Sequence, residues 1–367
     1  MHQKVAVSLF AYMIFRKRSS VQSLYYITHN LKRPRLIKLN PLDPLLWILR
    51  RNESDIVNCY NFMTPYFRHA TRGSNMLNFG YWSKKTEDPM QAQGELCSLV
   101  GEFANLNSAK NMLDVGSGFS APAIQWKSIY NLLNIICVNI NLLQLKTAKS
   151  LVNEDISSDI LKSKESTITT RSLYLNNRAD NISLVNANAK VLPFKDKCMD
   201  RIIALESAQH FKPLIHFIQE AKRILKNDGL LVIAIPVTTT TDKESLSLAQ
   251  QFRKLGILAL TWASEHHELG NVISLINDAG FGIVEIQNIG SRVYAPFTEY
   301  YVKNRRAIKS VILKGSGSSS SLSSPSLFHN VLYDVAENFI YKSALKMKEI
   351  SQKGLIDYVL IRAKSNN

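Results

Sequence analysis

Residues 113–121 read Leu113-Asp114-Val115-Gly116-Ser117-Gly118-Phe119-Ser120-Ala121, a turn that follows an apolar run and precedes a stretch able to form a helix. Glycine has no Cβ atom, so Gly116 and Gly118 allow the backbone to turn sharply and to approach a ligand closely. The amides at the start of the following helix can bind a carboxylate or a phosphate. We therefore expect a ligand site here, at the edge where open α/β sheets bind their ligands.

Short apolar runs and helical patterns alternate along the chain from this turn onward. Strands that alternate with helices indicate a parallel sheet covered on both faces. We predict an α/β fold, a Rossmann-like, doubly wound and mostly parallel seven-stranded sheet with helices on both faces and a helical cap. The expected strands are residues 111–115, 133–140, 182–186, 201–205, 229–235, 282–289 and 355–363, and the expected helices include 89–103, 142–152, 213–225, 243–280 and 328–352.

The chain has 367 residues, of which 46% are hydrophobic, enough for a substantial core. We expect one folded domain over residues 52–367, in which 52–108 and 243–353 form the helical cap. Two segments inside it read as surface features. Residues from about 157 to 177 are polar and longer than a usual loop, which predicts an insertion, and residues 315–326 form a Ser/Gly-rich loop.

Residues 1–51 form a basic N-terminal extension that carries +9 of the formal net charge of +16, from ten Lys and Arg residues against Asp43. Such charge attracts an anionic membrane surface, a nucleic acid or an anionic substrate, and a solvated basic tail is the plain alternative. The apolar run Val5–Phe15 is too short to span a bilayer, which takes about 20 residues. We expect a cytoplasmic protein that contacts membranes at most peripherally, through residues 1–51.

The four cysteines show no Cys-x-x-Cys spacing, and no group of Cys and His residues has the spacing of a zinc site. We therefore expect reduced thiols and no metal site.

The glycine turn resembles the first motif of the class I S-adenosylmethionine-dependent methyltransferases, Asp-x-Gly-x-Gly-x-Gly. Asp114, Gly116 and Gly118 match this motif, and Ser120 stands at its third glycine. The resemblance implies that the turn holds the methionine part of the cofactor. A dinucleotide site is the alternative, but Asp114 would repel a pyrophosphate, whereas it can accept hydrogen bonds from an ammonium group.

Two later segments extend the resemblance, which covers roughly residues 60–300 and the strand expected at 355–363. Asn139 stands where the family usually has an acid that binds both ribose hydroxyls, and Gln144 follows five residues later. Asn188, followed by Ala189, stands at the adenine-contacting Asp of the family's Gly-Asp-Ala-x-x-Leu-Pro-Phe, ahead of Leu192-Pro193-Phe194. The resemblance implies that these residues bind the ribose and the adenine.

The run from Ala204 to Phe211 resembles the Glu-Ser-x-x-His-Phe of small-molecule O- and C-methyltransferases. The resemblance implies that His210 acts as a general base toward a hydroxyl or carbon acid, and that Glu206 orients His210 or lies beside the sulfonium. A structural histidine is the plain alternative. The run Asn78-Phe79-Gly80-Tyr81-Trp82 resembles another motif of this branch, which implies that Tyr81 donates its hydroxyl to the methionine carboxylate; a packed aromatic turn is the alternative.

Together these motifs predict a methyltransferase that uses S-adenosylmethionine to methylate an oxygen or carbon of a small-molecule or lipid-like acceptor. An RNA methyltransferase is the first alternative, favoured by the charge. The run Leu205-Glu206-Ser207-Ala208 differs from the Asn-Pro-Pro-Tyr type used on exocyclic amines, and the chain has no separate RNA-binding motif, so nucleic acid is not the expected partner. A non-catalytic protein that retains the fold is the second alternative, because Ser120, Asn139 and Asn188 depart from the family pattern.

Overall fold

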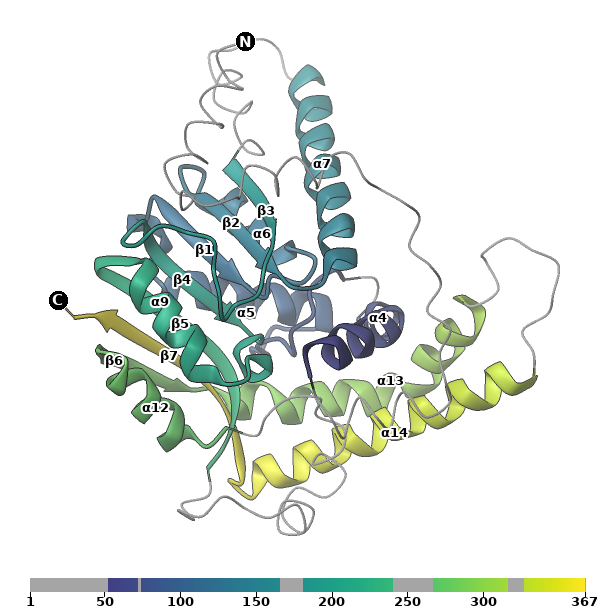
Figure 1. Cartoon of the computed structure of the whole chain (residues 1–367). Helices are drawn as coiled ribbons and strands as arrows, with labels where there is room; N and C mark the ends of the chain where they lie inside the picture. The colour runs from purple at the N-terminus through teal and green to yellow at the C-terminus, as the bar shows by residue number, and fades with distance from the viewer. Residues whose placement is uncertain (1–51, 72–73, 166–180, 240–266, 316–326, 367) are drawn as a thin grey trace.

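The computed structural model describes residues 52–71, 74–165, 181–239, 267–315 and 327–366 (Figure 1). The basic extension 1–51 lies outside the described residues. So do most of the Ser/Gly loop, residues 166–177 of the expected insertion and residues 243–266 of an expected helix.

Seven strands form one sheet in the order β3-β2-β1-β4-β5-β7-β6 (Figure 1). The pairs formed among β1 to β5 are parallel, and β7 runs antiparallel to both β5 and β6. The predicted doubly wound, mostly parallel sheet is therefore confirmed. The strands are β1 (Asn111–Val115), β2 (Asn134–Asn139), β3 (Ile182–Asn186), β4 (Met199–Leu205), β5 (Leu225–Thr238), β6 (Phe281–Asn288) and β7 (Ile356–Ser365).

Helices cover both faces of the sheet. Successive side chains of a strand point to opposite faces, so neighbouring residues belong to different cores. Leu113 and Val115 of β1 face a core formed with α9 (Leu214–Ile224) and α12 (Leu269–Asp278). Met112 faces the opposite core, which contains residues of α5, α6 and α14. These helices span Pro89–Phe103 (α5), Ala121–Ile129 (α6) and Leu327–Gln352 (α14). Because residues two apart in a strand point to the same face, Asp114 lies on the same face as Met112.

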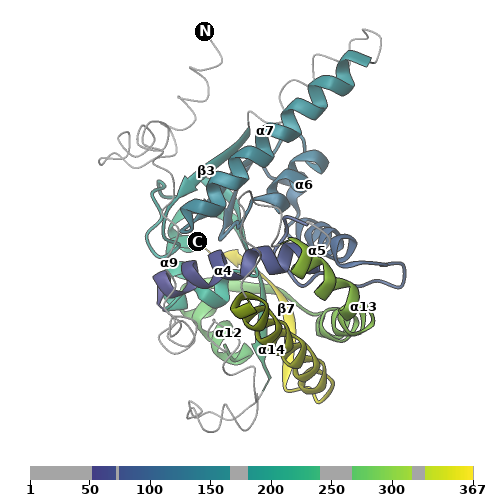
Figure 2. The same ribbon diagram turned by 90° about the vertical axis from the view of Figure 1, so that its right-hand side faces the viewer.

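The remaining long helices are α4, α7 and α13. Helix α13 (Tyr294–Gly315) runs beside α14, and α4 (Glu53–Ala70) packs against α13 (Figures 1 and 2). Helix α7 (Leu142–Glu165) continues into the segment expected as an insertion. In the described parts of the chain, no helix is both long and apolar enough to cross a membrane.

Two boundaries differ clearly from the expected ones: α7 ends at Glu165 instead of near residue 152, and β5 starts before Gly229. The run Lys226-Asn227-Asp228-Gly229 was expected to follow a helix that ends near residue 225, with the strand starting at Gly229. Instead, α9 ends at Ile224 and β5 begins at Leu225. The pairing of Leu225 with Met199 explains this early start, because an irregularity in the register follows it before Leu230 pairs with Arg201.

Candidate active site

An open cavity lies where β1, β2, β3 and β4 end, with α4 and residues 75–78 as its outer wall. Its space, counted together with the open solvent at its mouth, is about 1060 Å³. The structure brings nine of the ten predicted site residues to this cavity: Asp114, Gly116, Gly118, Asn139, Gln144, Asn188, Ala189, Glu206 and His210. Tyr81 does not line it.

The glycine turn has the tight geometry that its sequence predicts. Gly116 has a φ of +79°, and a Cβ atom on it would lie 2.3 Å from the Cβ of Ser207. The hydroxyl of Ser207 donates a 2.5 Å hydrogen bond to the carbonyl of Val115, which fixes the loop after β4 against the turn. Ser120, at the position of the third family glycine, has a φ of +57° and so keeps the left-handed conformation that a glycine would supply.

Asp114 is buried beneath this turn with one oxygen unsatisfied. It is 2% exposed, and its Oδ2 atom has no hydrogen-bond partner among the described residues. Burial raises its pKa to about 7. A buried carboxyl that lacks a partner fits the ammonium group of an amino-acid ligand, because a positive charge there favours the carboxylate.

Asn139 and Gln144 form a hydrogen-bonded pair at the end of β2. The Nδ2 of Asn139 donates to the carbonyl of Gly118 (3.0 Å) and to Oε1 of Gln144 (2.8 Å). The Oδ1 of Asn139 accepts from the amide of Asn141. The Nε2 of Gln144 is buried and has no partner among the described residues, so it can donate to a ribose oxygen.

Asn188 contacts an acid that sequence reasoning missed. Its Nδ2 donates to Oε1 of Glu53 (2.8 Å), and the amide of Lys190 donates to its Oδ1. Lys190 also forms a 2.7 Å ion pair with Glu53 and holds the pKa of that carboxyl below its usual range. Glu53 is 135 residues from Asn188 in the chain, so no local pattern points to this contact.

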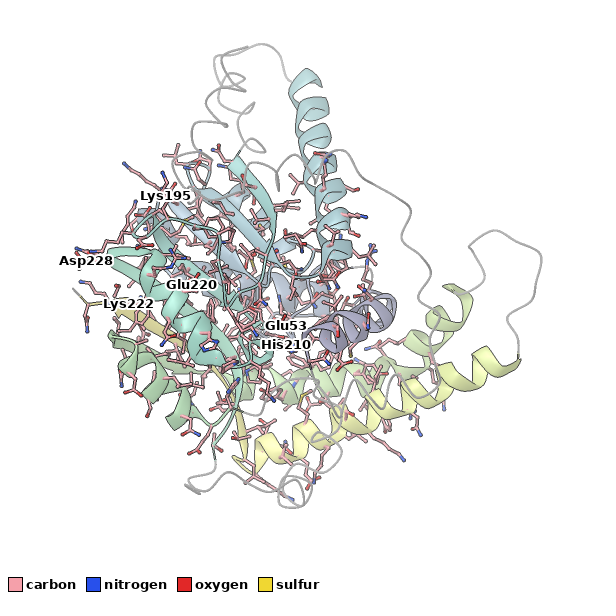
Figure 3. All side chains as sticks on the ribbon, in the orientation of Figure 1. Glu53, Lys195, His210, Glu220, Lys222 and Asp228 are labelled. Carbon is pink, nitrogen blue, oxygen red and sulfur yellow. The ribbon has the colours of Figure 1, made fainter. Side chains whose placement is uncertain are left out.

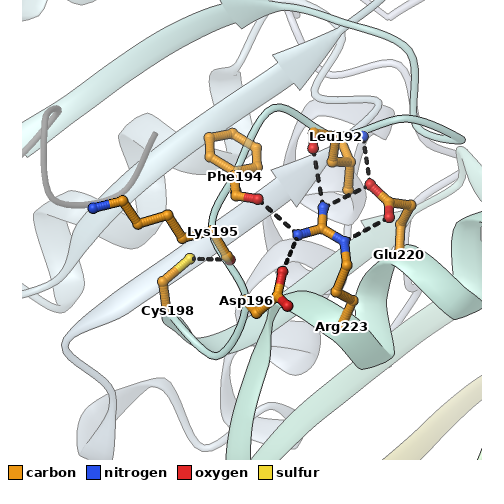
Figure 4. A network of polar contacts seen from close by, with 7 residues as sticks. All are labelled: Leu192, Phe194, Lys195, Asp196, Cys198, Glu220 and Arg223. Carbon is orange, nitrogen blue, oxygen red and sulfur yellow. Dashed lines mark hydrogen bonds and ion pairs between the residues drawn. The ribbon is translucent and has the colours of Figure 1, made fainter. Parts of the chain in front are cut away.

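The loop that follows Asn188 is held by Arg223 of α9 (Figure 4). Its guanidinium donates to the carbonyls of Phe194 (2.7 Å) and Leu192 (3.1 Å) and pairs with Glu220 and Asp196. One polar network outside the cavity therefore links the Leu192-Pro193-Phe194 segment to the end of α9.

His210 contacts Tyr60 of α4 at the cavity wall. The Tyr60 hydroxyl and Nε2 of His210 lie 2.7 Å apart, and the two rings meet edge to face. Burial raises the pKa of Tyr60, so its hydroxyl stays protonated. Figure 3 shows Glu53 and His210 close together beside the start of α4, the helix that supplies both Glu53 and Tyr60.

Glu206 ties the loop after β4 to the Asn78–Trp82 segment. Its Oε1 accepts from the amide of Phe79 (2.8 Å) and from the hydroxyl of Tyr358 (3.0 Å), and burial raises its pKa to about 8. The neutral carboxyl therefore positions neighbouring segments, while the hydrogen bond of His210 described above is shared with Tyr60.

Tyr81 packs against the core instead of facing the cavity. Gly80, with a φ of +83°, turns the chain onto α5, where a Cβ atom would lie 2.5 Å from the Cβ of Ala92. The Tyr81 amide then donates to the carbonyl of Ala92, and its ring packs half-buried against the core that contains α5. The contact predicted between Tyr81 and the methionine carboxylate does not fit this placement, whereas Asn78 of the same segment lines the cavity.

A family model described as a methyltransferase domain matches residues 113–233. Erythromycin 3''-O-methyltransferase from Saccharopolyspora erythraea is 24% identical over 265 residues, which cover 70% of this chain and 78% of that protein. Sterol 24-C-methyltransferase from Pneumocystis carinii is 25% identical over 171 residues, which cover 47% of this chain and 39% of that protein.

Solved structures share the fold at lower identity. The cyclopropane synthase MmaA2 from Mycobacterium tuberculosis has a TM-score of 0.61 and is 16% identical. The match covers 89% of this chain and all of that chain. A geranyl diphosphate methyltransferase in complex with GPP and sinefungin has a TM-score of 0.60 and 12% identity, covering 85% of this chain and 98% of that one.

The cavity suits the cofactor of this family. The glycine turn leaves room for a ligand, Asp114 has an unsatisfied oxygen for an ammonium group, and Gln144 has an unsatisfied donor for a ribose oxygen. With the matched methyltransferase domain and the related enzymes, this arrangement identifies the chain as a class I S-adenosylmethionine-dependent methyltransferase.

Proposed function

We propose that the protein methylates a hydroxyl oxygen or an acidic carbon of a small, largely apolar acceptor, with His210 as the general base. The observation that carries this proposal is the 2.7 Å contact between Tyr60 and His210 in the wall of the cofactor cavity. It supports a base in the tautomer in which Nε2–H donates to the Tyr60 oxygen, because that hydrogen bond fixes the ring and leaves the lone pair on Nδ1.

The acceptor class rests on the cavity wall and on the relatives. Residues 53, 56, 57 and 60 of α4 line the cavity from one helical face, and Ile56 and Val57 make its centre apolar. Two relatives are described as methylating erythromycin and a sterol, both of them small molecules. An acceptor with an apolar body and one reactive hydroxyl or carbon fits this wall.

His210 and Tyr60 have distinct parts in the proposed transfer. When bound, the cofactor would supply a methyl group from its sulfonium, and the electron pair of the broken carbon–sulfur bond would stay on sulfur. His210 takes the proton of the acceptor as the new bond forms, and Tyr60 keeps the imidazole in place. Positioning supplies most of the rate, because the sulfonium is already activated.

The test compares His210→Ala with His216→Ala, a histidine on the exposed side of α9 that does not line the cavity. Methylation is measured with labelled S-adenosylmethionine against a macrolide sugar, a sterol and an isoprenoid alcohol. We expect His210→Ala to lower turnover by about 10²- to 10⁴-fold, with unchanged affinity for S-adenosylhomocysteine, and His216→Ala to leave both unchanged.

Unchanged turnover in His210→Ala would remove the base role. A protein that binds S-adenosylhomocysteine and methylates none of these acceptors, but methylates RNA, would favour the RNA alternative. A solved neighbour described as a [4+2]-cyclase shares this fold with a TM-score of 0.61, so the fold alone does not establish methyl transfer and the assay must detect the methylated product.

We also propose peripheral membrane contact through residues 1–51, which lie outside the described residues. The support is their charge of +9 together with the apolar run Val5–Phe15, since two weak signals combined can give reversible binding. Flotation with anionic liposomes should fall when residues 1–50 are deleted, and equal flotation of both forms would contradict the proposal.

A further inference from the structure

Four exposed apolar side chains lie at the opening of the cavity where β2 and β3 end. We call them the apolar rim: Ile140 (39% exposed), Leu142 (45%), Leu143 (43%) and Val191 (74%). Ile140 lines the cavity, and each of the other three directly adjoins a residue that lines it. Large apolar side chains that are exposed singly are common, but a group of them at one opening indicates a surface that a partner covers.

Hydrogen bonds hold the two parts of the apolar rim at one edge of the sheet. β2 and β3 are neighbouring strands, and Nδ2 of Asn186, the last residue of β3, donates to the carbonyl of Ile140 (3.0 Å). The amide of Val191 donates to the carbonyl of Asn188, which lines the cavity. The rim residues that follow β2 and the one that follows β3 therefore lie beside the same opening.

The exposed side of α7 adds positive charge next to the apolar rim. Helical residues three, four and seven apart lie on one side of a helix, so Lys146 and Lys149 share a side of α7 with the two rim leucines. Glu53, an acid that lines the cavity, forms an ion pair with Lys190, which compensates its charge. The surface beside the opening is therefore apolar at the rim and basic along α7.

The basic extension joins the structure at the same opening. Residues 1–51 carry a charge of +9, and the described chain starts at Asn52, directly before Glu53 of the cavity wall. The two α7 lysines repel this extension, and both favour an anionic partner. Nucleic acid is anionic too, but aliphatic side chains gain little from phosphates, whereas they enter the acyl region of a lipid surface.

We propose that the mouth of the cavity docks on an anionic lipid surface, with the apolar rim among the lipids and the two α7 lysines beside the headgroups. The inference rests on the proposed function, because it gives an apolar acceptor a direct route from the lipid into the cavity. It adds residues of the folded domain to the membrane contact proposed for residues 1–51.

Co-sedimentation of the full-length protein with vesicles tests the apolar part of this surface. The vesicles are phosphatidylcholine, alone or with about one third phosphatidylserine. We expect Leu142→Gln/Leu143→Gln to weaken binding to the anionic vesicles about 10- to 30-fold, because two apolar side chains no longer enter the lipid. The matched control is Leu132→Gln/Leu345→Gln, which changes leucines 84% and 40% exposed that do not line the cavity and should leave binding unchanged.

A second pair of variants tests the charge. Lys146→Gln/Lys149→Gln should weaken binding to the anionic vesicles about 10-fold and leave binding to pure phosphatidylcholine unchanged, because lysines near the surface are attracted only to charged lipids. Lys84→Gln/Lys85→Gln is the control, since these two exposed lysines lie outside the cavity lining. Calorimetry with S-adenosylhomocysteine accompanies every variant, and an unchanged affinity shows that the variant is folded.

Equal vesicle binding by the rim variant and the unaltered protein would overturn the inference and would leave the contact through residues 1–51 standing. An equal loss in the leucine control would also overturn it. So would weaker binding of RNA with unchanged binding of vesicles, which would assign the surface to nucleic acid. Vesicle binding needs no acceptor, so failure of the proposed function appears separately, as a protein that binds vesicles and methylates nothing.

Discussion

The two ends of the cavity differ in whether their polar side chains are already hydrogen-bonded within the protein. At the end formed by β1 and β4, Asp114 and Glu206 are buried with raised pKa values, and Asp114 and Asn78 have unsatisfied atoms. At the end formed by β2 and β3, Asn139 and Asn188 are hydrogen-bonded to neighbouring protein groups. The first end requires a charged ligand to satisfy it, whereas the second has its shape set before any ligand arrives.

This difference explains how asparagine can stand at two positions where the related family has acids. A hydrogen-bonded amide keeps its direction without a charge, so the β2–β3 end can present Gln144 and Glu53 in fixed places. At the other end, Asp114 is a buried carboxyl with a raised pKa and one unsatisfied oxygen.

The largest effect is expected from Gly116→Ala. The new Cβ atom would meet Ser207, and the φ of +79° is unfavourable for any residue with a Cβ atom. Strain and overpacking together should cost about 3 kcal/mol of stability and abolish binding of S-adenosylhomocysteine. Thermal melts and calorimetry check both. Gly118→Ala is the control, since its Cβ would meet Leu77 only at 3.5 Å; an equal loss there would contradict the steric explanation.

Asp114→Asn should have the next largest effect and should change the pH dependence of binding. An ammonium group favours the carboxylate, so in the unaltered protein affinity for S-adenosylhomocysteine should rise as pH increases from 6 to 8, through the pKa of about 7. The variant should bind about tenfold more weakly above pH 7, with a flat profile. Calorimetry at pH 6, 7 and 8 measures this, and parallel profiles would assign the pH effect to another group.

The same group gives a stability test in the ligand-free protein. Its folded pKa of about 7 lies above the ordinary value of 3.8, so the folded state holds its proton more tightly than the unfolded state between these values. This group therefore lowers stability progressively as pH rises from about 4 to 7. Asp114→Asn should remove that part of the slope in thermal melts.

The smallest effect is expected at the other end, from Asn188→Asp. This change restores the acid of the related family, but the new carboxylate would lie beside Glu53, with which Asn188 now shares a 2.8 Å hydrogen bond. Because Glu53 is partly exposed, we expect a loss of only about 1 kcal/mol in stability. Adding Glu53→Gln should recover it, since an amide can donate to the new carboxylate. Without such recovery, repulsion by Glu53 is not the cause.

The fold was predictable because its signals are local. The glycine turn after β1 and the alternation of Met112 and Leu113 between two cores follow directly from neighbouring residues. The start of β5 at Leu225 was not predictable in this way, because the pairing of Leu225 with Met199 is long-range and outweighs the local helix-stop signal.

The candidate site shows the same division. Residues on the strand ends were found because the carboxyl ends of parallel strands meet at one edge. Glu53 and Tyr60 were missed because α4 reaches the cavity across 135 and 150 residues of chain. Tyr81 does not line the cavity, and its direction depends on how Gly80 packs against Ala92, a long-range contact that the local sequence does not indicate.

Glu53 and Tyr60 are seven residues apart on α4, which at 1.5 Å per residue separates them by about 10 Å along one rigid rod. Glu53 is hydrogen-bonded to Asn188, at the end where we propose that the adenine binds, and Tyr60 is hydrogen-bonded to His210, the proposed base. Any movement that lifts α4 must break both contacts. If these two roles hold, the free energies of filling the nucleoside end and of ordering the base are coupled, and that coupling acts equally in both directions.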